Sequence, residues 1–132
     1  MGNRNNEIIE LSLPVNAAYV SAARLTASSI VNRLGFGIDE IEDVKAAVSE
    51  ACTLLIKLIP TDSVQYFKVC FEPGEQSITV RIRAEQGFPF VPDEGEMSLM
   101  VIRALMDTVE ITRSGNGAEM RMVKWHSKRE FL

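Results

Sequence analysis

The chain has 132 residues and a formal net charge of -4, with 46% hydrophobic and 24% charged residues. This length suits one domain spanning residues 1–132, and the hydrophobic content favours a packed core over a disordered chain. The negative charge and an isoelectric point near 5.0 argue against a general nucleic-acid binder, which carries a basic face. The basic residues from Lys124 to Arg129 are interpreted as a solvated tail.

The sequence predicts a cytoplasmic protein without a metal site. No apolar run approaches the ~20 residues that span a bilayer, and the start, MGNRNNEIIE, has no hydrophobic stretch of the signal-peptide kind. Cys52 and Cys70 lie within apolar segments and are predicted to be buried free thiols in a reducing compartment. Together with His126, which has no candidate partner in the sequence, they give no metal-ligand spacing.

A strand and a helix are predicted first along the chain. Residues 7–14, EIIELSLP, alternate apolar and polar side chains before a proline, which predicts a strand. Asn16 is a plausible cap for the following helix, and Gly35 and Gly37 end it. The residues at helical spacing, predicted to face the core, are Tyr19, Ala23, Ala27, Ile30, Val31 and Leu34.

A second helix is predicted up to Pro60. Asp39, followed three residues later by Glu42, resembles a capping box in which Asp39 is the cap. The predicted core stripe of this helix consists of Ile41, Val44, Val48, Ala51, Leu55 and Leu58.

Two hairpins and a third helix complete the chain. Strand formers around EPGEQ predict a hairpin over residues 63–85, and residues 108–125 predict another with Gly-Asn-Gly at its turn. A loop at residues 86–96 and a helix of roughly three turns within MSLMVIRALMDTV (residues 97–109) lie between them. Its predicted buried residues are Leu99, Ile102, Leu105 and Met106. The methionines interpreted as core filler are Met97, Met100, Met106, Met120 and Met122.

The order of these elements predicts an α+β fold. The succession β-α-α-β-β-α-β-β is accounted for by a two-layer sandwich, in which three helices cover one face of a mixed, mostly antiparallel sheet.

Two segments resemble a known family. DVKAAVSEACT (residues 43–53) and VIRALMDTVEI (residues 101–111) are similar to the anti-sigma factor serine kinases, which belong to the GHKL superfamily of histidine-kinase-like ATPases. The resemblance runs from residue 11 to about residue 124, and the predicted element order fits that fold. It implies a protein that binds a sigma factor and uses ATP and Mg²⁺ to phosphorylate a serine of an anti-anti-sigma protein. It also implies that the protein can form homodimers.

The resemblance places Glu50 at the position of the general base. One turn later the family has an asparagine that holds Mg²⁺, and this chain has Leu54. Because residues one turn apart share a helix face, Leu54 is expected to point into the same pocket as Glu50. Leucine offers no oxygen to a hard cation.

Two glycine boxes complete the implied nucleotide site. The first, which meets adenine, corresponds to Glu85 and Gly87, with glutamate in place of the usual aspartate and no second glycine after it. The second, which cradles phosphate, corresponds to Gly95 and Ser98, with serine in place of the inner glycine. These departures, together with Leu54 and a short lid, predict that Mg-ATP binding and kinase activity are weak or lost. The alternative is an active kinase with a relaxed site, in which Glu85 reaches adenine through water.

A partner site is implied on the first helix. Arg24 falls where the family has an arginine that meets acidic groups of partners, a task that suits its bidentate guanidinium, and Tyr19 and Ser28 lie nearby. The alternatives are that Arg24 is an ordinary surface residue and Tyr19 a core residue. Glu50 also has alternatives: it pairs with Lys45 or Lys57, or it persists without a role. A further hypothesis is a subunit that dimerises with an intact paralogue.

Overall fold

The computed structural model describes residues 7–60, 66–84, 92–114 and 117–127. Its elements follow in the order β1 (Ile9–Pro14), η2 (Ala17–Tyr19, a 3-10 turn), α1 (Val20–Arg33), α2 (Ile38–Leu58), β2 (Tyr66–Pro73), β3 (Ser77–Ala84), α3 (Met97–Leu105), β4 (Thr108–Ser114) and β5 (Gly117–Trp125). The predicted succession of helices and strands is thereby confirmed.

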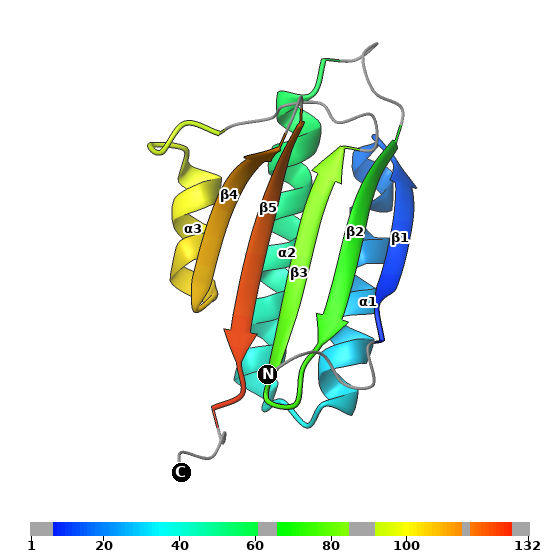
Figure 1. Cartoon of the computed structure of the whole chain (residues 1–132), viewed down its shortest axis with the longest axis vertical. Helices are drawn as coiled ribbons and strands as arrows, with labels where there is room; N and C mark the ends of the chain where they lie inside the picture. The colour runs from blue at the N-terminus through cyan, green and yellow to red at the C-terminus, as the bar shows by residue number, and fades with distance from the viewer. Residues whose placement is uncertain (1–6, 61–65, 85–91, 115–116, 128–132) are drawn as a thin grey trace.

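The sheet has five strands in the spatial order β1-β2-β3-β5-β4 (Figure 1). Every neighbouring pair among these described strands is antiparallel, which refines the prediction of a mixed, mostly antiparallel sheet. Two hairpins, β2–β3 and β4–β5, supply most of the sheet. The crossover through α3 carries the chain from the middle of the sheet to its edge, so β5 lies beside β3 and β4 lies outside it.

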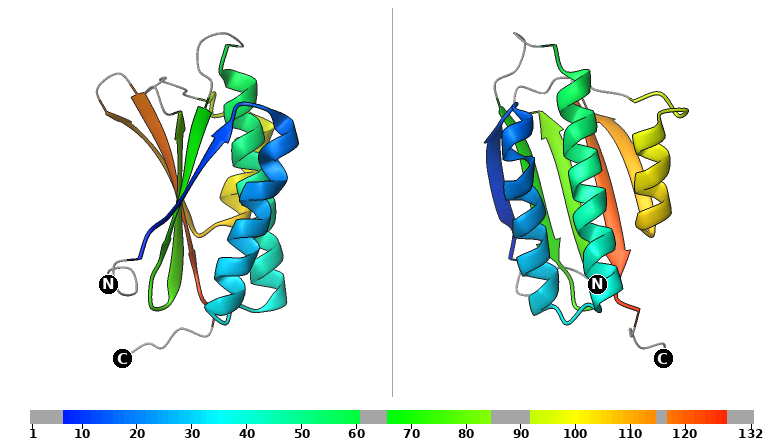
Figure 2. Two further views of the ribbon diagram at one scale, coloured as in Figure 1. Left: turned by 90° about the vertical axis from the view of Figure 1, so that its right-hand side faces the viewer. Right: turned by 180° about the vertical axis from the view of Figure 1, so that it is seen from behind.

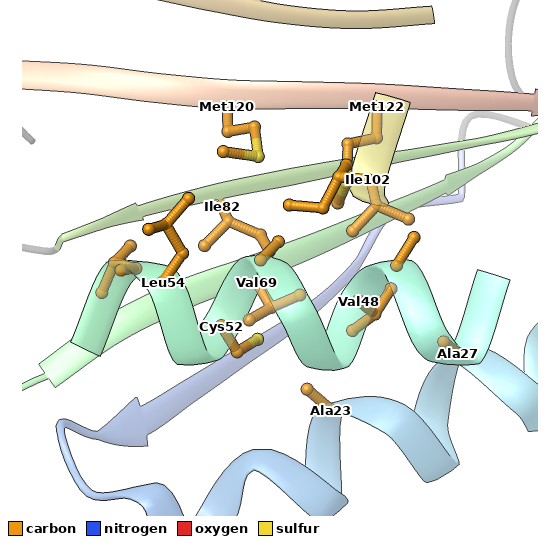
Figure 3. Packing of buried hydrophobic residues seen from close by; sticks show 14 of the residues in the cluster. Ala23, Ala27, Val48, Cys52, Leu54, Val69, Ile82, Ile102, Met120 and Met122 are labelled. Carbon is orange, nitrogen blue, oxygen red and sulfur yellow. The ribbon is translucent and has the colours of Figure 1, made fainter. Parts of the chain in front are cut away.

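Helices α1, α2 and α3 lie on one face of the sheet, as predicted (Figure 2). Side chains alternate along a strand, so every second residue faces the helices. On β2 and β3 the fully buried residues of this kind are Phe67, Val69, Phe71, Ile78, Val80 and Ile82. Figure 3 shows how residues of α2 meet them and the methionines of β5.

The two ends of α1 follow from local chemistry. Asn16 caps the 3-10 turn ahead of the helix, where its Oδ1 accepts a hydrogen bond from Ala18 N at 2.9 Å. After the helix, Gly35 adopts a φ of 80°, which favours glycine. Ala23 and Ala27 are fully buried, but Tyr19 is 46% exposed. A core position for Tyr19 was therefore wrong, because this residue ends the 3-10 turn and lies outside the helical stripe of α1.

The cap of α2 differs from the prediction. The helix begins at Ile38, so its N-cap is Gly37 and not Asp39, and Glu40 occupies the third helical position. Glu40 Oε1 accepts a hydrogen bond from Gly37 N at 2.9 Å, and its Oε2 accepts one from Ser127 N at 2.5 Å. Burial opposes ionisation of Glu40, but these hydrogen bonds prevail and lower its pKa.

The methionines divide into two groups. Met106, Met120 and Met122 are buried, as predicted for core filler. Met97 and Met100 are 70% and 55% exposed, so that prediction was wrong for them. They lie on the side of α3 opposite Leu99 and Ile102, which α3 buries. One short helix at the edge of a two-layer domain has only one face to bury.

The end of β5 is not a solvated tail. Lys124 is 14% exposed, and its Nζ donates hydrogen bonds to Asp43 Oδ2 at 3.3 Å and to Leu105 O at 2.7 Å. His126 Nε2 lies 2.7 Å from the Gly35 carbonyl oxygen, and its ring packs edge-on against Phe36. The tail interpretation was wrong for Lys124 and His126, because they bind the helices to the end of the sheet.

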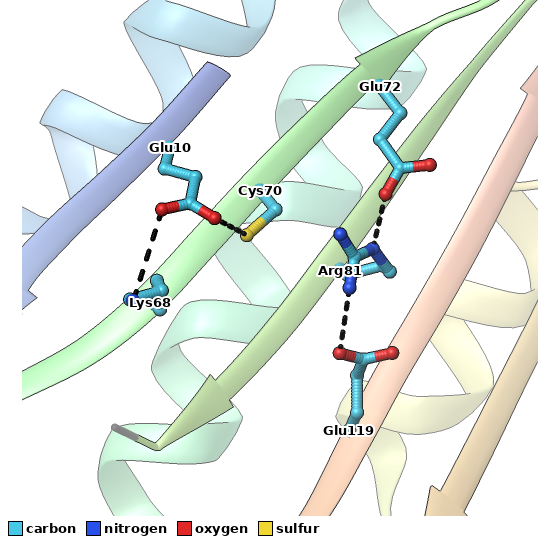
Figure 4. A network of polar contacts seen from close by, with 6 residues as sticks. All are labelled: Glu10, Lys68, Cys70, Glu72, Arg81 and Glu119. Atoms are coloured by element: carbon cyan, nitrogen blue, oxygen red, sulfur yellow. Dashed lines mark hydrogen bonds and ion pairs between the residues drawn. The ribbon is translucent and has the colours of Figure 1, made fainter. Parts of the chain in front are cut away.

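Polar groups on the uncovered face of the sheet pair with one another. Arg81 lies between two carboxylates, with Nε 2.5 Å from Glu72 Oε2 and Nη1 3.2 Å from Glu119 Oε1 (Figure 4). Cys70 Sγ donates to Glu10 Oε2 at 3.6 Å. These contacts cross neighbouring strands and satisfy charged groups on the face opposite the described helices (Figure 2).

Both cysteines are free and buried, as predicted. Burial raises the pKa of Cys52 to about 12. Burial, with the Glu10 carboxylate, also raises the pKa of Cys70. A thiol that resists ionisation is a poor nucleophile. Cys52 packs in the hydrophobic core, whereas Cys70 contacts Glu10 on the other face of the sheet.

Candidate functional site

Glu50 and Leu54 occupy adjacent turns of α2 but different environments. Glu50 is half-buried at the margin of the helix face that meets the core. Leu54 is 1% exposed and packs in the hydrophobic cluster, on the side of α2 where Ile82 and Met120 lie (Figure 3). The position where the resemblance expects a magnesium ligand is therefore filled by a buried hydrocarbon side chain.

Glu50 does not form either of the ion pairs considered from the sequence. Lys45 Nζ lies 3.1 Å from Glu42 Oε2, and Lys57 Nζ lies 3.3 Å from Glu96 Oε2. Within the described part of the chain, Glu50 has no hydrogen bond or ion pair through its carboxylate. This leaves its oxygens open to solvent or to a ligand.

The start of α3 carries the residues of the second glycine box. Gly95 precedes the helix, and its amide donates a hydrogen bond to Asp93 Oδ1 at 2.8 Å. Ser98 is the second residue of α3 and is half-buried. Glu96 is the N-cap, but its side chain forms no capping hydrogen bond.

Lys57 and Glu96 connect the end of α2 to the start of α3. Because Lys57 lies one turn beyond Leu54, this contact brings the candidate base helix and the candidate phosphate loop together. Asp93, Glu94 and Glu96 make this loop acidic, and Glu94 pairs with Arg103 at 3.5 Å. The sequence reasoning missed this charge. The sequence signal for this acidic loop is its run of carboxylates, directly before the helix whose start is expected to receive phosphate.

Glu85 and Gly87, the expected adenine contacts, lie outside the described residues. The described residues of the candidate nucleotide site fit Mg-ATP poorly. Leu54 has no oxygen, the Gly95 amide already has a carboxylate partner, and further carboxylates stand where phosphate is expected. Searching the described ranges also gives no group of three His, Cys, Asp or Glu side chains able to hold a metal ion.

The residues expected to contact a partner all lie on or beside α1. Arg24 is half-buried, and its Nη1 lies 3.4 Å from Ser49 Oγ of α2. Ser28 is half-buried one turn later, and Tyr19 is exposed at the start of the helix. The neighbouring Leu25 is 61% exposed, a feature that the sequence reasoning did not single out.

A pocket opens away from the α2–α3 contact. It has a volume of about 250 Å³ and lies where the end of α1 meets the start of β1 and the end of β2. Its lining includes Ile9, Ile30, Leu34 and Pro73, with Arg33 among its polar residues.

Among the helices that the structure describes, none combines the length and the apolar character that a membrane span needs.

Comparison with known proteins identifies relatives of this fold. The sequence profile of the histidine kinase-like ATPase domain matches residues 13–124. The serine-protein kinases RsbW of Bacillus thuringiensis (strain Al Hakam) and Bacillus cereus (strain AH820) are each 30% identical to this chain, over 90% of it and 85% of their own length. The RsbW protein of Bacillus anthracis (strain CDC 684 / NRRL 3495) matches equally well.

The fold is also found among solved structures. The crystal structure of the RsbU and RsbW domains of a Mycobacterium tuberculosis protein superposes with a TM-score of 0.68 at 16% identity. The match covers 90% of this chain but only 32% of that longer one. With the profile match and the sequence identities, this shows that the chain belongs to the histidine kinase-like ATPase domain family, among the relatives of the RsbW serine-protein kinases.

Proposed function

We propose that this protein is a cytoplasmic anti-sigma regulatory factor that captures a sigma factor, an anti-anti-sigma protein or both, and that its ATP-dependent kinase activity is weak or lost. Kinship with RsbW supports the regulatory role. The observation that carries the loss of activity is Leu54, which fills the expected magnesium-ligand position and is only 1% exposed.

The burial of Leu54 bears on whether a small movement of its side chain could let the site bind magnesium. A side chain at the surface of a pocket could swing aside and let water complete the shell of a cation. Leu54 instead contributes to the core, where exposing a leucine costs about 2 kcal/mol. The position therefore supports the fold of this chain and offers nothing to a cation.

Arg24 supports the capture role. An arginine has five N–H donors, and the described contacts of Arg24 use one of them, toward Ser49. This contact holds the guanidinium beside the α1–α2 surface and leaves its other donors for a carboxylate of a partner. Tyr19 and Ser28 are proposed to extend this surface along α1.

A second candidate is an active serine kinase that phosphorylates an anti-anti-sigma protein. Its support is the identity with serine-protein kinases and the retained carboxylate of Glu50, which has no ion pair in the described structure. A third arrangement is a dimer with an intact paralogue, which would supply the missing chemistry from the other chain. A homodimer is a further arrangement, but both of its copies would carry Leu54. Mass measurement of the purified protein alone and mixed with that paralogue distinguishes these assemblies.

Thermal unfolding with nucleotides tests the proposal. The melting temperature is measured with ATP and ADP, each with and without Mg²⁺, and with an active RsbW protein as positive control. A ligand at a hundredfold its dissociation constant would stabilise the fold by about 2.7 kcal/mol, which is readily seen. We expect no magnesium-dependent rise, and a clear rise would favour the active kinase.

A further inference from the structure

We infer that Glu96, with Asp93, is a specificity-determining carboxylate that keeps phosphate-bearing ligands away from the start of α3. The inference rests on the family resemblance, which implies a phosphate position at this helix end, and on the proposed function. It goes beyond it by assigning the exclusion to two residues that act independently of magnesium.

The start of α3 would otherwise suit an anion. The first amides of a helix have no partner within the helix, and its dipole favours negative charge there. Glu96 is placed to cap these amides, but its side chain makes no capping hydrogen bond. The carboxylate thus contributes its charge at this position without serving as a cap.

Lys57 holds the Glu96 carboxylate. The Nζ–Oε2 distance is 3.3 Å, and the two side chains are 64% and 24% exposed. An exposed pair of this kind contributes little to stability, so its main consequence is electrostatic. It occupies the Lys57 ammonium, which would otherwise attract phosphate, and it holds the Glu96 carboxylate beside the first turn of α3.

Asp93 acts on the amide just before the helix. Its Oδ1 accepts the hydrogen bond of Gly95 N at 2.8 Å, which is the kind of contact that a phosphate oxygen would make. A phosphate would have to displace this carboxylate and approach Glu96 at the same time. Nucleoside diphosphates, triphosphates and pyrophosphate are therefore the excluded class, and the repulsion weakens as salt rises.

The test removes charge while preserving shape. ADP in the presence of EDTA is titrated by calorimetry at low ionic strength into the wild type, Glu96→Gln, Asp93→Asn and the double variant. Asparagine keeps an oxygen to accept the Gly95 hydrogen bond, so Asp93→Asn isolates charge, and Asp93→Ala removes both. Glu75→Gln is the matched control, since Glu75 is exposed in the β2–β3 turn at the opposite end of the sheet (Figure 1).

The double variant is expected to bind ADP about tenfold more tightly than the wild type or the Glu75→Gln control, because close charge repulsion is of that order. Adding Lys57→Met should reduce the gain, because the ammonium that Glu96→Gln frees is then absent, and high salt should reduce it too. A correctly folded double variant that binds no better than wild type overturns the inference and leaves the proposed function standing. Magnesium-dependent ADP binding by the wild type instead contradicts the proposed function itself.

Discussion

Helix α2 meets α1 along one flank and α3 along the other, and the two contacts are built differently. Toward α1 the fully buried alanines Ala23 and Ala27 let the helices approach closely, and Arg24 reaches Ser49 across the contact. Toward α3, the charged pair Lys57–Glu96 closes one end and Lys124 joins both helices at the other. The α1 flank carries Arg24, the residue expected to hold partners, whereas on the α3 flank the buried Leu54 stands at the expected magnesium-ligand position.

Under the proposed function, this difference separates recognition from chemistry within one fold. A partner surface needs only a rigid helix and a few exposed groups, which core packing alone can maintain. A phosphoryl-transfer site needs each ligand at its place, and the loss of one protein oxygen weakens its hold on the metal. The predictions below alter one flank at a time.

The largest effect is expected from Leu54→Asn, which restores the side chain that the family uses. The structure predicts a loss of about 4 kcal/mol in the free energy of unfolding, because the change removes core volume and buries an amide. Leu54→Met should cost less than about 1.5 kcal/mol. Urea denaturation measures both. A stable Leu54→Asn protein that binds Mg-ATP would contradict the described role of the α3 flank.

Arg24→Glu tests the opposite flank. If Arg24 meets acidic groups of a partner, reversing its charge should weaken binding by about 3 kcal/mol, while the free energy of unfolding changes by less than about 1 kcal/mol. Interferometry with sigma factors and anti-anti-sigma proteins from the source genome measures the binding. Arg33→Glu, at the end of the same helix, is the control. Equal binding by wild type and Arg24→Glu would refute the partner assignment.

Lys124→Met compares the two ends of the α2–α3 contact. Lys124 is largely buried and satisfies both Asp43 and the last carbonyl of α3, so its loss should cost about 2 kcal/mol. Lys57→Met removes an exposed pair at the other end and should cost less than about 0.5 kcal/mol. Chemical denaturation of both variants side by side gives the answer. A reversed order would show that the Lys57–Glu96 pair holds the helices together.

The smallest effect is expected from Glu40→Gln, in the α1–α2 turn, and it concerns how stability depends on pH. The folded protein lowers the pKa of Glu40, so the resulting stabilisation is present above the unfolded pKa and is lost as pH falls through the folded value. Glu40→Gln should therefore reduce stability by less than about 1 kcal/mol near neutral pH, and the difference should shrink below about pH 4. Denaturation at several pH values checks this. A difference that grows in acid would contradict it.

Much of the fold followed from the sequence because its signals are local. Alternation defined the strands, helical spacing defined the buried stripes of α1 and α2, and Gly35 marked the end of α1. The cap of α2 was misplaced because Asp39 and Glu40 both suit a first turn. Only the carbonyl of Gly37 and the contact with Ser127, which comes from the far end of the chain, distinguish them.

The candidate site was less accessible to sequence reasoning. The family resemblance pointed to Glu50 and Leu54. The burial of Leu54, however, depends on strands that are distant in sequence. The roles of Lys57 and Glu96 depend on a contact between residues that lie far apart in the chain. Likewise, the exposure of Met97 and Met100 depends on how α3 packs and could not be inferred from their residue type.

The most direct test of the account is a nuclear magnetic resonance titration of the isotopically labelled protein with ADP and Mg²⁺. The amides of Glu50, Leu54, Gly95 and Ser98 report on the α3 flank, and those of Arg24 and Ser28 provide an internal reference on the other flank. We expect no saturable, magnesium-dependent shift at the α3 flank. Saturable shifts confined to that flank and abolished by EDTA would contradict it.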